Sequence, residues 1–253
     1  MSSQATDHPT LPDIVGHRGA ALCAPENTLL SLRRAIADGA DAVEVDVHLS
    51  RDGVVMVLHD ETVDRTATDT SPCRTGAVAD LTAAELAEVE LPEGQRIPTL
   101  AQALEVCVRE DGSPVPMLVE VKAVAAARAA VRELQRRHGD RVGENAVVIS
   151  FYAEALRAVR EAEPRIPLGY LQDSTDASTA SVLRGLHAER LSVDVDHVTA
   201  AGAQLAREAG AELHVWTTNT AEQVDRALAA GAASLTTDDP RRIRAMVEAR
   251  RAR

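Results

Sequence analysis

The chain has 253 residues, of which 45% are hydrophobic and 26% are charged, a composition typical of a globular domain rather than a disordered chain. Its 27 basic and 39 acidic residues give a formal net charge of −12, which disfavours nucleic acids and anionic lipid surfaces as partners. One Phe, one Trp and two Tyr are too few aromatic side chains for serial stacking on single-stranded nucleic acid. We therefore expect no nucleic-acid partner.

No run of apolar residues approaches the roughly 18 that a membrane-spanning helix needs. Residues 1–12 contain neither the basic region nor the apolar stretch of a secretory signal. The three cysteines, Cys23, Cys73 and Cys107, are an odd number without zinc-like spacing, which is compatible with a reducing compartment. The sequence therefore predicts a cytoplasmic protein with no stable membrane insertion.

Short β-branched runs alternate along the chain with longer segments of helical period. In chain order, the predicted strands are 14–15, 42–49, 115–121, 146–149, 167–171, 191–195, 213–217 and 234–237. The first helix is predicted between the capping residue Thr28 and Gly39. The helices expected after it are 99–108, 124–138, 153–163, 176–187, 199–209, 220–230 and 240–250. Residues 54–58 are expected to continue the second strand as extended chain after the Asp52-Gly53 turn.

Eight strand–helix units in this length predict an α/β fold, a closed (β/α)8 barrel of the TIM type. One stretch, from about 60 to 98, interrupts the alternation: it is polar, rich in Thr, Asp, Gly and Pro, and has a short helical piece at 82–88. Loops of this length in compact domains are usually functional or small insertions. We expect an insertion subdomain after the second strand, within a single domain covering residues 1–253.

Charged side chains lie between valines on two of the predicted strands. Because side chains two apart on a strand share a face, Glu44, Asp46 and His48 lie together, as do Glu120 and Lys122. If the strand ends converge, three carboxylates meet, and each pair about 4 Å apart would repel by roughly 4 kcal/mol. A hard cation, Mg²⁺ or Ca²⁺ with Mn²⁺ as a third candidate, or raised pKa values would offset this repulsion. The alternative is a salt-bridge network with Lys122 that only supports the structure.

Two histidines follow extended segments directly and are expected at the rim where barrel active sites lie. His17 precedes Arg18 and Gly19 after the first strand, and His59 follows the extended run after the second. A histidine pair can serve as general base and general acid near neutral pH. Arg18 offers a planar fork suited to phosphate and Lys122 a point charge, while Gly19 allows a tight turn with close backbone approach.

Taken in order, these motifs resemble the glycerophosphodiester phosphodiesterases. The matching segments are His17-Arg18-Gly19, Pro25-Glu26-Asn27-Thr28, Glu44-Val45-Asp46-Val47, His59-Asp60 and Glu120-Val121-Lys122. The stretch with Asp64-Arg65-Thr66 and Ile97-Pro98-Thr99-Leu100 looks like the family's small insertion, and Val215-Trp216-Thr217 and Thr237-Asp238 look like its late strands. The resemblance covers about residues 13 to 240, and the combination of motifs is far more specific than any one of them.

The resemblance implies a metal-dependent phosphodiesterase on a TIM barrel, which releases glycerol 3-phosphate and an alcohol from glycerophosphodiesters. Matched position by position, it implies Glu44, Asp46 and Glu120 as metal ligands, His17 and His59 as the acid/base pair, Arg18 and Lys122 as phosphate contacts, and Phe151 and Trp216 on the glycerol side of the pocket. In this family the first histidine is commonly described as accepting a proton and the second as donating one. The attacking oxygen, from water or from the neighbouring glycerol hydroxyl, stays open.

Three other functions fit part of the pattern. A lysophospholipase D-like or related phospholipid-headgroup phosphodiesterase would need an apolar rim, whereas residues 60–98 are mostly polar. A binding module for a phosphorylated polyol would not need the histidine pair. A sugar-phosphate isomerase or aldolase fits the fold alone, and fold does not establish function. The headgroup preference, the identity of the ion and the oligomeric state also stay open.

Overall fold

A computed structural model describes residues 11–251 of the chain. The expectation that residues 1–12 are not a secretory signal falls mostly on residues 1–10, which lie outside the described part. Within residues 11–251, eight parallel strands pair side by side, and β1 closes the ring by pairing with both β2 and β11. These strands are β1 (Asp13–Gly16), β2 (Ala42–Leu49), β6 (Met117–Val121), β7 (Ala146–Ser150), β8 (Leu168–Gln172), β9 (Arg190–Asp194), β10 (Glu212–Trp216) and β11 (Ser234–Thr237).

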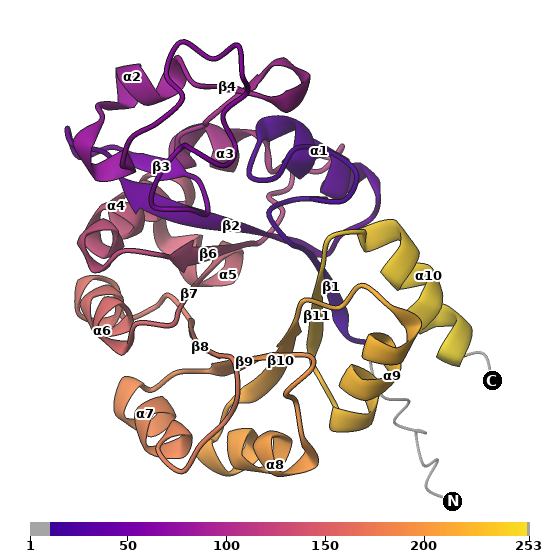
Figure 1. Ribbon diagram of the computed structural model, residues 1–253. Helices are drawn as coiled ribbons and strands as arrows, with labels where there is room; N and C mark the ends of the chain where they lie inside the picture. Colours follow the sequence, from indigo (N-terminus) through magenta and orange to yellow (C-terminus); the bar gives the residue numbers. More distant parts are fainter. Residues whose placement is uncertain (1–10, 252–253) are drawn as a thin grey trace, which may run out of the picture.

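A helix follows each barrel strand and lies on the outside of the ring (Figure 1). These helices are α1 (Leu29–Ala37), α3 (Leu100–Val106), α4 (Ala127–His138), α6 (Ala153–Ala162), α7 (Thr179–Leu186), α8 (Ala200–Ala209), α9 (Ala221–Ala230) and α10 (Pro240–Arg251). The predicted (β/α)8 barrel is therefore confirmed. Strand β2 has the predicted bounds, and the largest shift at a strand end is at β6, which begins at Met117 rather than at residue 115.

The alternation of side chains along the strands divides the core into an outer and an inner part. Val43, Val45 and Val47 of β2 are fully buried in the large hydrophobic cluster between the barrel and its helices. A smaller cluster inside the ring contains inward-facing residues such as Leu118 and Ile149. The even-numbered side chains of β2 therefore point into the barrel, which is why its carboxylates are available to a site at the centre.

Strand β3 (Val55–Val57) is antiparallel to β2 and is not one of the barrel strands. The segment after it contains α2 (Ala83–Ala87) and the two-residue strands β4 (Glu90–Leu91) and β5 (Gln95–Arg96). Together with β3 it forms a separate hydrophobic cluster, which includes Met56, Leu86 and Ile97. Figure 1 shows α2 and β4 at the top of the view, above β3 and α3. That this segment is a subdomain of one domain spanning residues 1–253 stays a prediction.

The short elements β4, β5 and α5 (Val142–Asn145) were not predicted, because two to four residues are too few to show a period. None of the helices in residues 11–251 combines the length and the apolar character that crossing a bilayer requires. All three cysteines are free thiols, and Cys107 is buried.

Candidate active site

A cavity of about 220 Å³ lies at the carboxyl ends of the barrel strands. It contains eight of the nine predicted site residues, and its full lining is His17, Arg18, Glu44, His59, Leu118, Glu120, Lys122, Ile149, Phe151, Leu171, Ser192, Trp216, Thr217 and Thr236. The ninth, Asp46, is 1% exposed and lies among these side chains. A larger hollow of about 870 Å³ lies at the other end of the barrel, around Asp13, Arg190 and Glu212, and none of the predicted residues lines it. The chemistry therefore converges on the smaller cavity.

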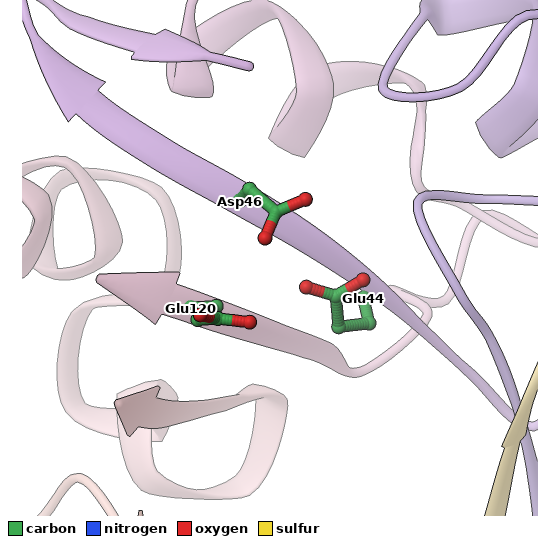
Figure 2. Close-up of side chains that lie close together, drawn as sticks. All are labelled: Glu44, Asp46 and Glu120. Atoms are coloured by element: carbon green, nitrogen blue, oxygen red, sulfur yellow. The ribbon is translucent and has the colours of Figure 1, made fainter. Parts of the chain in front are cut away.

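Three carboxylates meet inside the barrel. Glu44 and Asp46 project from β2, and Glu120 projects from the neighbouring strand β6 (Figure 2). They come together because the parallel register pairs Asp46 with Glu120 and Glu44 with Leu118. One oxygen atom of each carboxylate lies within 4.8 Å of the others, and Glu44 and Asp46 are almost completely buried. The predicted convergence of these strand positions is thus present in the fold.

The surroundings of the three carboxylates raise the pKa values of two of them and lower the third. Burial raises the pKa of Glu44 well above its usual range, and the charges of Asp46 and Glu120 raise it further. Burial and the charge of Asp46 raise the pKa of Glu120 to about 7, although Lys122 opposes the shift. Burial also acts to raise the pKa of Asp46, but Lys122 and Arg18 outweigh it, so that this pKa is lowered. With only these side chains present, the cluster resists ionising all three carboxylates.

The two basic side chains of the site, Arg18 and Lys122, neither neutralise all three carboxylates nor bind all of their oxygen atoms. Lys122 Nζ lies 2.8 Å from Glu120 Oε1 and 3.5 Å from Asp46 Oδ1, and Arg18 Nε lies 3.2 Å from Asp46 Oδ2. The backbone N–H of Arg18 donates to Glu44 Oε2 at 2.9 Å. The other oxygen of Glu44 is buried without a hydrogen-bond partner among the described residues. Two cations against three carboxylates, with one orphaned oxygen, fit a hard divalent cation better than a salt-bridge network alone.

The main chain turns sharply where it leaves β1. Arg18 has a φ of 50° and Gly19 a φ of 83°. A Cβ at Gly19 would lie 2.4 Å from Ser31 Oγ, so the turn requires glycine, as expected from the sequence. Ser31 Oγ accepts from the N–H of Ala20 and donates to the carbonyl of Arg18, each at 2.8 Å. Helix α1 therefore holds the loop that presents the Arg18 side chain to the carboxylates.

His17 is held by a carboxylate from the far end of the chain. Its Nδ1 lies 2.6 Å from Oδ1 of Asp238, whose other oxygen accepts from Asn219 Nδ2 at 2.5 Å. An ionised carboxylate can only accept, and hydrogen bonds from His17 and Asn219 lower the pKa of Asp238 against the effect of its burial. The Nδ1 of His17 therefore carries the hydrogen, and Nε2 is the nitrogen available to exchange a proton.

His59 is also held by a carboxylate at Nδ1, but a different part of the fold brings it to the site. Its Nδ1 lies 2.7 Å from Asp60 Oδ1, and its carbonyl accepts from His48 Nε2 at 3.1 Å. His59 was expected at the rim because it follows an extended segment. That segment, β3, runs antiparallel to β2, so His59 does not reach the site as a residue at the carboxyl end of a parallel barrel strand. The hairpin returns the chain along β2, and the N–H of Leu58 donates to the carbonyl of Asp46 at 3.0 Å.

One wall of the cavity is apolar. The rings of Phe151 and Trp216 meet edge to face, with centroids 5.7 Å apart and planes at 88°. Both rings pack against the inner cluster that includes Leu118, Ile149 and Leu171. The indole Nε1–H of Trp216 is buried without a hydrogen-bond partner among residues 11–251. This wall can accept a small carbon skeleton.

Several residues that shape the site received no role from the sequence. Asn27 Nδ2 donates to Asp46 Oδ2 at 2.8 Å, and Asp238 and Asp60 hold the two histidines. Arg65 binds both Asp60 and Glu26. All of them lie in segments that match the family motifs, and that match was the one signal in the sequence that could have singled them out.

The sequence matches the family described as "Glycerophosphoryl diester phosphodiesterase family" over residues 17–242. The glycerophosphodiester phosphodiesterase of Caldanaerobacter subterraneus subsp. tengcongensis is 28% identical over 90% of this chain and 94% of its own length. A probable glycerophosphodiester phosphodiesterase 1 of Mycobacterium tuberculosis is 31% identical over 95% and 94%. The structure of an Oleispira antarctica phosphodiesterase, solved with its product sn-glycerol-3-phosphate, has a TM-score of 0.82 and 25% identity, with 94% of this chain and 97% of that one covered. The chain belongs to the glycerophosphoryl diester phosphodiesterase family.

Proposed function

We propose that this protein is a metal-dependent phosphodiesterase that hydrolyses glycerophosphodiesters to sn-glycerol 3-phosphate and an alcohol. One observation carries the proposal: two histidines, each with a carboxylate on Nδ1, line the same cavity as a three-carboxylate cluster with an orphaned oxygen. Binding a phosphorylated polyol without turnover would not require two oriented proton-exchanging groups. The product found in the Oleispira antarctica phosphodiesterase supports the substrate class.

In this proposal, Glu44, Asp46 and Glu120 hold one divalent cation, Mg²⁺ or Ca²⁺ with Mn²⁺ as a third candidate, because their donor set consists of oxygen atoms. When bound, such an ion supplies Lewis-acid polarisation of a phosphoryl oxygen. Glu44 and Glu120, whose pKa values are raised in the protein alone, would ionise more readily beside such a charge. The metal and the ionised cluster therefore stabilise each other.

The two histidines divide the proton transfers in this proposal. His17 accepts a proton at Nε2 from the attacking oxygen, and Asp238 stabilises the imidazolium that results. His59, held by Asp60, gives a proton at Nε2 to the departing alkoxide. The attacking oxygen comes from water or from the glycerol hydroxyl next to the phosphate; in the second route a cyclic phosphate forms first and water opens it.

The remaining groups bind and orient the substrate. Arg18 and Lys122 stabilise the charge that develops on the phosphoryl oxygens. Their contacts to the carboxylates, at 2.8 to 3.5 Å, hold both cations beside the carboxylate cluster in the cavity. Phe151 and Trp216 receive the carbon skeleton of the glycerol unit.

We also propose a cytoplasmic location, no nucleic-acid partner and no stable membrane insertion. The net charge of −12 supports the absence of nucleic-acid binding. The free thiols Cys23, Cys73 and Cys107 are compatible with a reducing compartment.

The first test is the release of glycerol 3-phosphate from glycerophosphocholine, measured by a coupled assay on chelated protein to which Mg²⁺, Ca²⁺ or Mn²⁺ is restored in turn. Metal-dependent release that is lost in His17→Ala supports the proposal. His197→Ala is a matched control, because His197 lies after β9 with an exposed side chain that does not line the cavity. No release from folded protein with any metal would shift the assignment to a lysophospholipid substrate, and no release from lysophospholipids would favour a binding role.

A further inference from the structure

Arg65, which follows β3 in the inserted segment, joins two parts of the active-site rim that are far apart in the sequence. Its Nε donates to Asp60 Oδ2 at 2.6 Å. Its two terminal nitrogens donate to Glu26, from Nη1 to Oε2 at 3.0 Å and from Nη2 to Oε1 at 2.6 Å. Glu26 lies in the loop between β1 and α1, 39 positions before Arg65. One guanidinium group therefore bridges the β1–α1 loop and the segment that carries His59.

Both carboxylates bound by Arg65 also contact side chains of the cavity. Asp60 Oδ1 accepts from Nδ1 of His59 at 2.7 Å, and Glu26 Oε1 accepts from Arg18 Nη1 at 3.0 Å. The hydrogen bond to Arg65 lowers the pKa of Asp60 to about 2. Asp60 therefore stays ionised, and stays an acceptor for the His59 ring, throughout the pH range in which a histidine titrates.

Arg65 is better suited to this bridge than any other basic side chain. A guanidinium group is planar and has five donors in a fixed fork, so it can bind two carboxylates at once in defined directions. A lysine has the same charge, but its compact ammonium group cannot bind two carboxylates in fixed directions as the planar guanidinium does. Without Arg65, Asp60 would lose its partner at Oδ2 and, being a quarter exposed, could turn toward water instead of His59.

We propose that Arg65 is a positioning residue: it holds Asp60 in the orientation that fixes the Nδ1–H tautomer and the ring plane of His59. The catalytic consequence rests on the proposed function, whereas the effect on the His59 ring does not. The inserted segment then contributes directly to the active site, because it supplies the side chain that locks one of the two proton-exchanging groups to the opposite loop.

The kinetic test compares Arg65→Ala and Arg65→Lys with the control Arg96→Ala. Arg96 also lies in the inserted segment, pairs with a glutamate (Glu90 Oε1, 3.1 Å) and has a side chain 46% exposed against 50% for Arg65, but it does not contact the site. We expect both Arg65 variants to lose about 10- to 100-fold in kcat with a much smaller change in KM, as for other residues that orient a reacting group. Arg96→Ala should retain wild-type kcat. Thermal unfolding checks that each variant is folded, and Arg65→Lys serves if the alanine variant is not.

A double-mutant cycle separates positioning from a general structural effect. If Arg65 acts through His59, Arg65→Ala should change kcat less than about 3-fold in a His59→Ala background, because residues that act as a unit are not additive. Added guanidinium ion should restore part of the activity of Arg65→Ala and none of that of His59→Ala. An equal loss of kcat in both backgrounds would overturn the proposal.

A spectroscopic test needs no substrate. Two-bond ¹H–¹⁵N spectra of the histidine rings, recorded as a pH series into the alkaline range, report which ring nitrogen carries the hydrogen in the neutral ring. We expect the Nδ1–H form of His59 in the wild type and in Arg96→Ala, and a mixture of both forms in Arg65→Ala, with the His59 signal assigned from His59→Ala. An unchanged His59 tautomer in Arg65→Ala refutes the proposal. If the wild type shows no phosphodiesterase activity but the His59 tautomer changes in Arg65→Ala, only the proposed function is refuted.

Discussion

His17 and Asp238 are 221 positions apart in the chain, yet Nδ1 of the histidine lies 2.6 Å from Oδ1 of the aspartate. The contact exists because the first and last strands of the barrel pair in parallel, with Gly16 opposite Thr237. Each of these residues is followed directly by one member of the pair. The pairing of the first and last barrel strands therefore closes the ring and also places His17 beside Asp238 as a histidine–aspartate dyad.

This dyad leads to a prediction for turnover. His17→Ala should lower kcat by roughly 10²- to 10⁴-fold, the range that a general base supplies. Asp238→Asn should lower it less, because the ring that accepts the proton would remain, although its tautomer would no longer be fixed. Both are measured by release of glycerol 3-phosphate at saturating metal, with unfolding temperatures as a check of the fold. Near-full activity of His17→Ala would remove this residue from the mechanism.

A second prediction concerns the metal. Glu44→Gln should weaken the binding of Mg²⁺ or Ca²⁺ by at least about 10- to 100-fold, because it removes one of three charged ligands. Titration calorimetry on chelated protein measures this affinity, and Glu105→Gln on the exposed face of α3 is the control.

The same variant distinguishes a metal site from a purely structural network. Without metal, Glu44→Gln should unfold at the same temperature as the wild type or at a higher one, because a buried carboxylate with an orphaned oxygen becomes a neutral amide. A clear loss of stability without metal, with unchanged metal affinity, would instead favour the salt-bridge network.

A third prediction concerns stability at acid pH. The hydrogen bond from Arg65 lowers the pKa of Asp60 from its usual 3.8 to about 2, so ionised Asp60 stabilises the folded state. This contribution is fully present above about pH 4 and is lost as the pH falls from about 4 to 2. The shift corresponds to at most about 2.4 kcal/mol, which solvent screening of this partly exposed pair reduces to about 1 kcal/mol. Urea unfolding at pH 6 and pH 3 should show a smaller loss of stability for Asp60→Asn than for the wild type. Equal losses would show that the carboxylate contributes nothing.

A fourth prediction concerns the apolar wall. Trp216→Ala should raise KM for glycerophosphocholine about 10-fold, or roughly 1.4 kcal/mol, because the cavity loses one of the two aromatic rings that form its apolar wall. The change in kcat should be smaller. Tyr152→Ala is the control, since Tyr152 follows Phe151 but is 51% exposed and does not line the cavity. An unchanged KM in Trp216→Ala would mean that the substrate does not touch this wall.

The local pattern was sufficient for much of the fold. Strand β2 was predicted with its bounds, because eight residues with valines at alternate positions show a clear period of two. The same alternation placed Glu44 and Asp46 on one face, and in the structure their carboxylates lie together near that of Glu120. The short elements β4 and β5 were missed because two residues carry no period.

The sequence by itself determined which side chains share a face and which chemistry they offer, since both depend on neighbours along the chain. Only the tertiary structure decided which distant groups meet. The parallel register sets Asp46 opposite Glu120, the antiparallel return of β3 brings His59 back along β2, and Arg65 reaches Glu26 across the rim. The physical reason is that register, strand direction and loop contact are set by packing between segments far apart in the chain, and local periodicity contains no information about which segments pack together.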